Sequence, residues 1–178
     1  GSGVQKIELE LQKLFPKSRV LRLDSDLKES ELKAQIKKIE KHQFDILLGT
    51  QMIAKGLDLP SVDLVGIISA DTALHLPDYL SNEKTFDLIT QVSGRSGRRE
   101  LVGQTVIQTY WPENHAIVCA AKHNYQGFVE SELPVRKTFD YPPYKSIVRV
   151  ISQHTDKTKA KASLKKLALR LKENHKFF

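Results

Sequence analysis

The sequence predicts an α/β protein, in which a parallel sheet with helices on both faces is followed by a partial α+β domain. Helix-period and strand-period segments alternate along the first two thirds of the chain, which is the pattern of a parallel sheet with crossover helices. Residues 63–70, DLVGIISA, form an almost continuous apolar run that is typical of a central parallel strand. The pattern changes after Trp111-Pro112, so we expect a first domain at 1–112 and the start of a second, truncated domain at 113–178.

The first half of the predicted sheet comes from residues 4–48. Apolar residues at helical spacing predict a helix from Val4 to Phe15, which Pro16 ends, and 19–23 alternate as a strand. Asp26 and Glu29 resemble a capping pair for a helix whose apolar face is Leu32, Ile36 and Ile39. The apolar residues 46–48 then predict a short buried strand.

The second half comes from residues 51–110. A helical start at 51–55 leads to the apolar strand at 63–70, and 81–97 predict a helix with Phe86, Ile89 and Val92 facing inward. Residues 104–110 predict the last strand of this domain. Beyond it we expect a helix at 114–132, a turn at 141–144, a strand at 147–151 and a basic helix from Thr158 onward.

Composition favours a polyanionic partner. The 178 residues carry a formal net charge of +7, and most of the excess lies after His154, which favours nucleic acid. A solvated helix face is the alternative explanation of these lysines. The single cysteine, Cys119, fits a reducing compartment, and no apolar run has membrane-spanning length, so we expect a cytoplasmic protein. Residues 176–178 follow a helical pattern directly without a cap, so we also expect a fragment of a longer chain.

One candidate site follows the predicted strand at 46–48, since ligands of open α/β sheets bind beyond the carboxyl ends of strands. The stretch GTQMIAKGLDLP, residues 49–60, places polar groups, glycines and a helix start there, and could hold a phosphate backbone or a nucleotide sugar. Its candidate residues are Thr50, Gln51, Lys55, Gly56 and Asp58.

A second candidate site is the stretch QVSGRSGRRE, residues 91–100. Arg95 and Arg98 are three residues apart at the end of a helix and share a face, while Gly94 and Gly97 leave that end without bulk. Two guanidinium groups directed at one spot suit a transferring γ-phosphoryl group, whose transition state spreads negative charge over several oxygens. Gln91, one turn earlier, could orient a water. Taken alone, GRSGR could equally be a flexible basic turn or a generic RNA-binding sequence.

Together the two stretches resemble motifs V and VI of superfamily two helicases. With ADTALHLPDY and RKTFDYPPY, they are similar to the primosomal replication-restart helicases over nearly the whole chain. The resemblance implies a second RecA-like motor lobe. It implies that Arg98 is an arginine finger, that Arg95 contacts the ATP phosphates, and that Gln91 lies at the nucleotide cleft. It also implies that Gly56 and Asp58 link nucleotide state to DNA and that Thr50 touches the DNA backbone.

The groups that bind triphosphate and magnesium are missing from the sequence. No glycine is followed by lysine, so there is no phosphate loop, and no adjacent Asp-Glu pair offers a metal-binding box. We therefore expect ATP and Mg²⁺ to be bound mainly by a first lobe outside this chain, and the chain alone to hydrolyse no ATP. The resemblance places zinc in the longer protein only. The resemblance also implies the partners, which are DNA, the first lobe, single-strand-binding protein and other primosome proteins.

Several alternatives remain open. The chain could be a lobe of another superfamily two motor, such as a fork-remodelling helicase, or a non-enzymatic basic nucleic-acid-binding module. Asp71 and Asp78 follow the predicted strand at 63–70 and could do acid/base or metal chemistry, although turns and helix capping explain them equally well. Trp111 could stack on single-stranded bases or close the lobe. The six histidines show no metal-ligand spacing.

Overall fold

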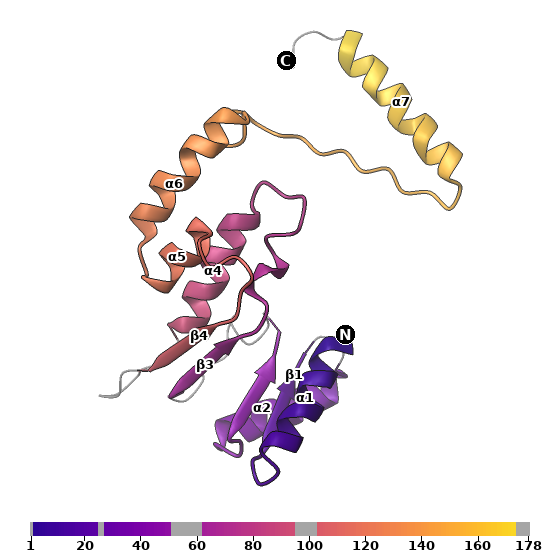
Figure 1. The fold of residues 1–178 in the computed structure, drawn as a ribbon. Helices are drawn as coiled ribbons and strands as arrows, with labels where there is room; N and C mark the ends of the chain where they lie inside the picture. The colour runs from indigo at the N-terminus through magenta and orange to yellow at the C-terminus, as the bar shows by residue number, and fades with distance from the viewer. Residues whose placement is uncertain (1, 25–26, 51–61, 95–102, 174–178) are drawn as a thin grey trace. The chain divides into compact units, whose positions relative to one another are not determined.

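The structure, a computed structural model, describes residues 2–24, 27–50, 62–94 and 103–173 (Figure 1). It divides into two compact units, Gly1–Pro134 and Val135–Phe178. The helices and strands in chain order are α1 (Ser2–Leu14), β1 (Val20–Leu23), α2 (Glu29–Glu40), β2 (Ile46–Gly49), β3 (Leu64–Ile67), the 3₁₀ helix η1 (Ala70–Thr72), α4 (Ser81–Ser93), β4 (Gln104–Ile107), α5 (His115–Ala121), α6 (Tyr125–Thr138) and α7 (Lys157–Glu173).

The α/β class predicted from the sequence is confirmed, and the strands described form two parallel pairs. In the first pair Leu21 of β1 is in register with Leu47 of β2. Leu21 and Leu23 are buried against Ile39 of α2. Because alternate strand residues point to opposite faces, Arg22 lies on the other face, where it bonds Glu8 of α1 at 2.8 Å. The helices α1 and α2 therefore cover opposite faces of this pair.

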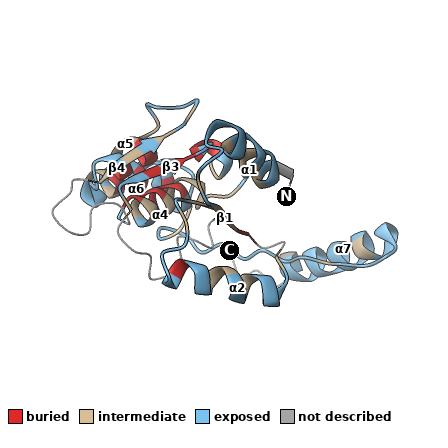
Figure 2. Ribbon diagram, turned by 90° about the horizontal axis from the view of Figure 1, so that it is seen from below, coloured by how far each residue is buried: buried red, intermediate tan, exposed pale blue. Residues whose placement is uncertain are grey.

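In the second pair Leu64 of β3 is in register with Gln104 of β4. Val65 and Ile67 are buried on one face, in the core cluster that also contains Phe86 and Ile89 of α4. Figure 2 shows buried residues on β3 and α4. Each fully buried apolar side chain of this size stabilises the fold by about 1.5–3 kcal/mol.

The helix α5 belongs to the same core as α4. Ala116, Ile117 and Ala120 of α5 are buried in the cluster with Phe86, and half-buried Cys119 packs against it. The predicted boundary at residue 112 stays a prediction, although the first compact unit extends to Pro134. The carboxyl boundary of this unit falls inside α6.

Two elements predicted from the sequence are wrong. The single helix expected at 114–132 is broken after Ala121, because His123 has a left-handed φ of 50°, and α6 begins after it. Asn124 caps that restart, since its Oδ1 accepts from the backbone N–H of Gly127 at 2.9 Å. The strand expected at 147–151 is absent from the described chain. Its alternating pattern is present, but Val148 is 85% exposed and no strand pairs with it.

The start of α2 also differs in detail from the predicted cap. The helix begins at Glu29 after the N-cap residue Lys28, and Glu31 accepts from the backbone N–H of Lys28 at 3.0 Å. Asp26 lies outside the described residues. A glutamate in the third helical position thus supplies the capping contact.

In the second unit, the predicted turn at 141–144 is confirmed by a hydrogen bond from Tyr144 N to Tyr141 O of 3.0 Å. The predicted basic helix is α7. Its apolar stripe is more than one third exposed at Leu164, Leu167 and Leu171, and its described lysines are also exposed. No helix in the described ranges is both long and apolar enough to cross a membrane.

Candidate functional site

Three of the residues predicted to form the site are described. Thr50 is exposed and directly follows β2, Gln91 is exposed in the last turn of α4, and Gly94 follows that helix. The other predicted residues lie outside the described residues: Gln51, Lys55, Gly56, Asp58, Arg95, Gly97 and Arg98. The structure therefore shows the scaffold that leads into both motifs.

The position of Gln91 follows from how α4 packs. Phe86 and Ile89 are 4% and 1% exposed in the core, while Gln91 lies on the exposed side of the same helix. A helix with 3.6 residues per turn separates these two faces without any local distortion. The side chain of Gln91 is thus presented to solvent by a helix whose opposite face is anchored.

Gly94 ends α4 in an ordinary right-handed conformation, with φ −65° and ψ −3°. Its N–H donates to the carbonyl oxygen of Thr90 at 3.0 Å. A Cβ at this position would lie 3.2 Å from that same oxygen, a closer approach than most Cβ atoms make. The backbone angles of Gly94 are open to any residue, so they do not by themselves require glycine here.

The described chain resumes after each motif at the same sheet edge. Val62 precedes β3 and Gly103 precedes β4, and the two strands start side by side, with Gln104 N donating to Asp63 O at 2.9 Å. Residues 95–102 therefore lead into the amino end of a strand, whereas Thr50 follows the carboxyl end of β2.

The carboxyl ends of β3 and β4 are joined by Asp71, which is 2% exposed. Thr109 Oγ1 donates to Asp71 Oδ1 at 2.6 Å, and Tyr110 N donates to Oδ2 at 3.0 Å. These hydrogen bonds, the one from Thr109 foremost, lower the pKa of Asp71 below its ordinary value. Both carboxylate oxygens have structural partners, which explains Asp71 without acid/base chemistry.

Asp78 also has a structural explanation, at the start of α4. Its Oδ1 accepts from the backbone N–H of Leu80 at 3.1 Å, and Lys84 Nζ lies 2.5 Å from Oδ2. A carboxylate that accepts from the N–H two residues later is typical of a turn. A turn that leads into α4 is therefore the interpretation that the contacts of Asp78 support.

The aromatic residues that follow β4, next to Thr109, are exposed. Tyr110 is 91% exposed and Trp111 54% exposed, so the indole does not close the core of the first unit. The backbone N–H of Trp111 donates to Thr109 Oγ1 at 2.9 Å, which fixes this turn next to Asp71.

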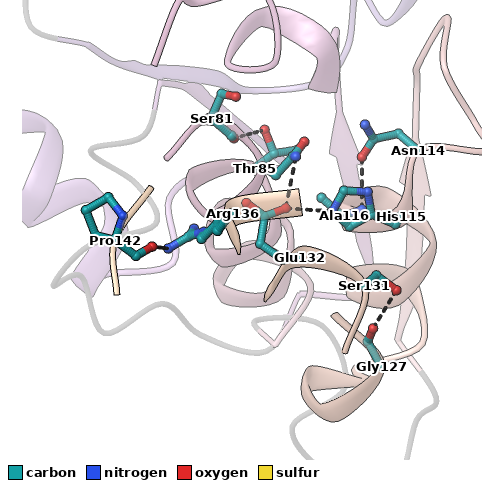
Figure 3. Close-up of polar contacts among 11 residues, drawn as sticks. Ser81, Thr85, Asn114, His115, Ala116, Gly127, Ser131, Glu132, Arg136 and Pro142 are labelled. Atoms are coloured by element: carbon teal, nitrogen blue, oxygen red, sulfur yellow. Dashed lines mark hydrogen bonds and ion pairs between the residues drawn. The ribbon is translucent and has the colours of Figure 1, made fainter. Parts of the chain in front are cut away.

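A polar cluster that sequence reasoning missed joins α4, α5 and α6 (Figure 3). Glu132 of α6 is 5% exposed, and its Oε2 accepts from Asn82 Nδ2 of α4 at 3.1 Å. The same oxygen lies 2.8 Å from His115 Nε2 at the start of α5, and the imidazole stacks on Phe128 at a centroid distance of 5.8 Å. A neutral imidazole with its proton on Nε2 makes this hydrogen bond, as does the charged form.

No local signal in the sequence indicates this cluster. Asn82 and Glu132 are 50 residues apart, and His115 and Glu132 are 17 apart, so neither pair has a helical spacing. The sequence does indicate the start of α5, because Asn114 is a typical N-cap residue. Its Oδ1 accepts from Ala116 N at 2.9 Å, and this contact fixes His115 as the first residue of the helix.

Comparison with known proteins gives one family and a set of relatives. The helicase conserved C-terminal domain family matches residues 2–100. The chain is 46% identical over 176 residues to replication restart protein PriA of Bacillus subtilis, covering 98% of this chain and 22% of that protein. It is 40% identical over 171 residues to PriA of Synechocystis sp., covering 95% and 21%. For PriA of Thermotoga maritima the identity is 36% over 168 residues, covering 93% and 23%.

The chain therefore spans about a fifth of the length of the curated relatives that it matches. Among solved structures, it is similar to the C-terminal domain of the DEAD-box protein Dbp5, with 20% identity and a TM-score of 0.45, covering 75% of this chain and 77% of that one. The resemblance that the sequence motifs suggested is confirmed by the family and by the PriA relatives.

Proposed function

The chain belongs to the helicase conserved C-terminal domain family, and from that premise we propose that it is the second motor lobe of an ATP-dependent DNA helicase. The helicase would act at stalled or abandoned replication forks and support the restart of replication. The observation that carries this proposal is the 46% identity to a replication restart protein over 98% of the chain.

In this proposal the arginine pair acts on ATP. Arg98 is the arginine finger, Arg95 contacts the phosphates, and Gln91 with Gly94 and Gly97 forms their side of the nucleotide cleft. The sheet register supports this grouping, because Val62 and Gly103 precede strands that start side by side. Asp58 is four residues before Val62 and Arg98 five before Gly103.

In this proposal the triphosphate is bound outside this chain. ATP and Mg²⁺ are bound mainly by a first lobe of the longer protein, and the arginines of this chain reach across the cleft to it. Fixed guanidinium groups supplied to a bound triphosphate stabilise the charge that develops on the transferring phosphoryl group. Zinc, where the longer protein binds it, is bound outside this chain.

DNA is the substrate that the motor moves along. Thr50, Gln51 and Lys55 contact its backbone, and Gly56 and Asp58 link nucleotide state to that contact. The exposed position of Thr50 beyond β2 is compatible with this role. Single-strand-binding protein and other primosome proteins are the proposed partners, in the bacterial cytoplasm near the nucleoid.

The test is unwinding of forked DNA by the longer protein that contains this chain. We expect ATP-dependent unwinding that Arg98→Ala abolishes, and no ATP hydrolysis by the chain alone. A lobe of another superfamily two motor would unwind DNA but would not support restart on a model fork. If the longer protein binds forks but neither hydrolyses ATP nor unwinds them, the non-enzymatic binding module replaces the motor.

A further inference from the structure

We propose that Glu132 is a positioning residue for Gln91, and that it acts through the helix α4; this inference rests on the proposed function. Among the described residues, Glu132 contacts Asn82 and His115. It holds the first turn of the helix that carries Gln91 in its last turn.

The first step is the contact itself. Glu132 Oε2 accepts from Asn82 Nδ2 at 3.1 Å and lies 2.8 Å from His115 Nε2, with the glutamate side chain 6% exposed. Loss of this acceptor would leave the amide of Asn82 and the imidazole of His115, both partly buried, without it. A polar group that loses its partner where water reaches it only in part is costly, so this contact defines one preferred position of α4 against α5 and α6.

The second step is transmission along α4. Asn82 and Gln91 are nine residues apart on one helix, so about 13.5 Å of continuous hydrogen-bonded backbone joins them. Thr85, 0% exposed, donates from Oγ1 to the carbonyl oxygen of Ser81 at 2.9 Å and adds a buried anchor next to Asn82. A shift of the first turn along the helix axis would therefore displace Gln91 by a similar amount.

The third step is that the apolar contacts of α4 do not fix this axial position by themselves. Phe86 stacks on Phe128 at 4.5 Å, and burial of such rings is favourable over a range of offsets. The hydrogen bonds to Glu132 depend on distance and angle. The aromatic contacts thus hold α4 against α6, and the carboxylate of Glu132 sets the position of α4 along the axis of that helix.

The test uses the longer protein and measures kcat and KM for ATP at saturating forked DNA, together with the midpoint of thermal unfolding. We expect Glu132→Ala to lower kcat on the order of tenfold, with a smaller change in KM. Glu132→Gln should stay close to wild type, because an amide oxygen can accept both hydrogen bonds that Oε2 accepts. The matched control is Glu130→Ala, which removes an exposed carboxylate from the same helix; in the described part of the chain this carboxylate accepts from Gln126, also in α6.

A double-mutant cycle with Gln91→Ala separates positioning from general loss of structure. If Glu132 acts through Gln91, Glu132→Ala lowers kcat much less in the Gln91→Ala background than in wild type. Multiplicative effects of the two substitutions, or a Glu132→Gln variant as slow as Glu132→Ala, would overturn the inference. Where Glu132→Ala fails to fold, Asn82→Ala removes the α4 donor alone and should show the same dependence on Gln91.

The proposed function has its own control in this experiment. If Arg98→Ala leaves kcat unchanged, the motor role of the arginine pair fails, whatever Glu132 does. If Arg98→Ala abolishes turnover while Glu132→Ala does not depend on Gln91, the positioning inference alone fails.

Discussion

Thr109 Oγ1 donates to Asp71 Oδ1 at 2.6 Å, and this contact joins the segments that follow β3 and β4. The two residues are 38 positions apart, so the contact closes a long part of the chain. It lies at the carboxyl ends of strands whose amino ends follow the two helicase motifs. The carboxylate therefore stabilises the pair of strands that follow these two motifs in the chain.

We expect Asp71→Asn to lower the thermal unfolding midpoint at neutral pH, because the amide nitrogen cannot accept from Tyr110 N. The folded pKa of Asp71 is depressed below 3.8, so its stabilisation is present above that pH and lost as the pH falls through the folded pKa. The difference in unfolding midpoint between wild type and Asp71→Asn should therefore become smaller at acidic pH. Asp63→Asn, an exposed carboxylate at the other end of β3, is the control. Equal effects at both sites would refute this account.

A second pH-dependent contact lies between β1 and β2. Arg19 donates to Asp45 from Nη2 at 2.8 Å, from Nε at 3.0 Å and from its backbone N at 2.7 Å. These hydrogen bonds, the side-chain ones foremost, lower the pKa of Asp45 from 3.8 to about 2.

Because the folded pKa of Asp45 is the lower one, the pair stabilises the fold fully above pH 3.8 and loses that effect as the pH falls toward about 2. We expect the unfolding midpoints of wild type and Asp45→Asn to differ at pH 6 and to converge near pH 2, measured by circular dichroism. Glu40→Gln, at an exposed site on α2, should show no such convergence. A constant difference down to pH 2 would contradict the assignment.

Ile89, 1% exposed, anchors α4 in the core. We expect Ile89→Ala to lower the free energy of unfolding by about 2–5 kcal/mol and Ile89→Val by about 1 kcal/mol. Val106→Ala, at a site 58% exposed on β4, should change it by less than about 0.5 kcal/mol. Urea denaturation measures all three. A loss at Ile89→Ala no larger than that at Val106→Ala would show that α4 is not anchored there.

The helices α1, α2 and α4 were predictable because their apolar residues recur at helical spacing, and the four strands because their apolar runs are short and bounded. The break at 122–124 was missed, although Asn124 is a readable N-cap. The strand at 147–151 was wrongly predicted, because alternation reports a suitable sequence and not the presence of a partner strand.

In the candidate site too, some features have a local signal in the sequence and others have none. Gln91 and Gly94 were predicted from a local motif, and the structure describes where both lie, at the end of α4, while their role in a site stays a prediction. The contacts of Asp71 with Thr109 and of Glu132 with Asn82 join residues 38 and 50 positions apart. Such contacts depend on how the helices and strands pack, which no local pattern encodes.

The exposed lysines of α7 should contribute to DNA binding. We expect the double reversal Lys165→Glu/Lys166→Glu to weaken binding of single-stranded DNA and to reduce the slope of log K against log salt concentration by about 1–1.5. The matched control is Lys37→Glu/Lys38→Glu, which makes the same charge change at two exposed lysines of α2. If both double variants weaken binding equally, net charge and not a surface on α7 explains the affinity.

The most direct test of the motor proposal compares ATP hydrolysis and DNA binding in Arg98→Ala of the longer protein. An arginine finger predicts that kcat for DNA-stimulated hydrolysis falls by about 10³-fold or more, while the Kd for forked DNA stays within about twofold of wild type. Unchanged hydrolysis together with a lost affinity for DNA would instead make Arg98 a DNA contact, and would contradict the role of this chain as a motor lobe.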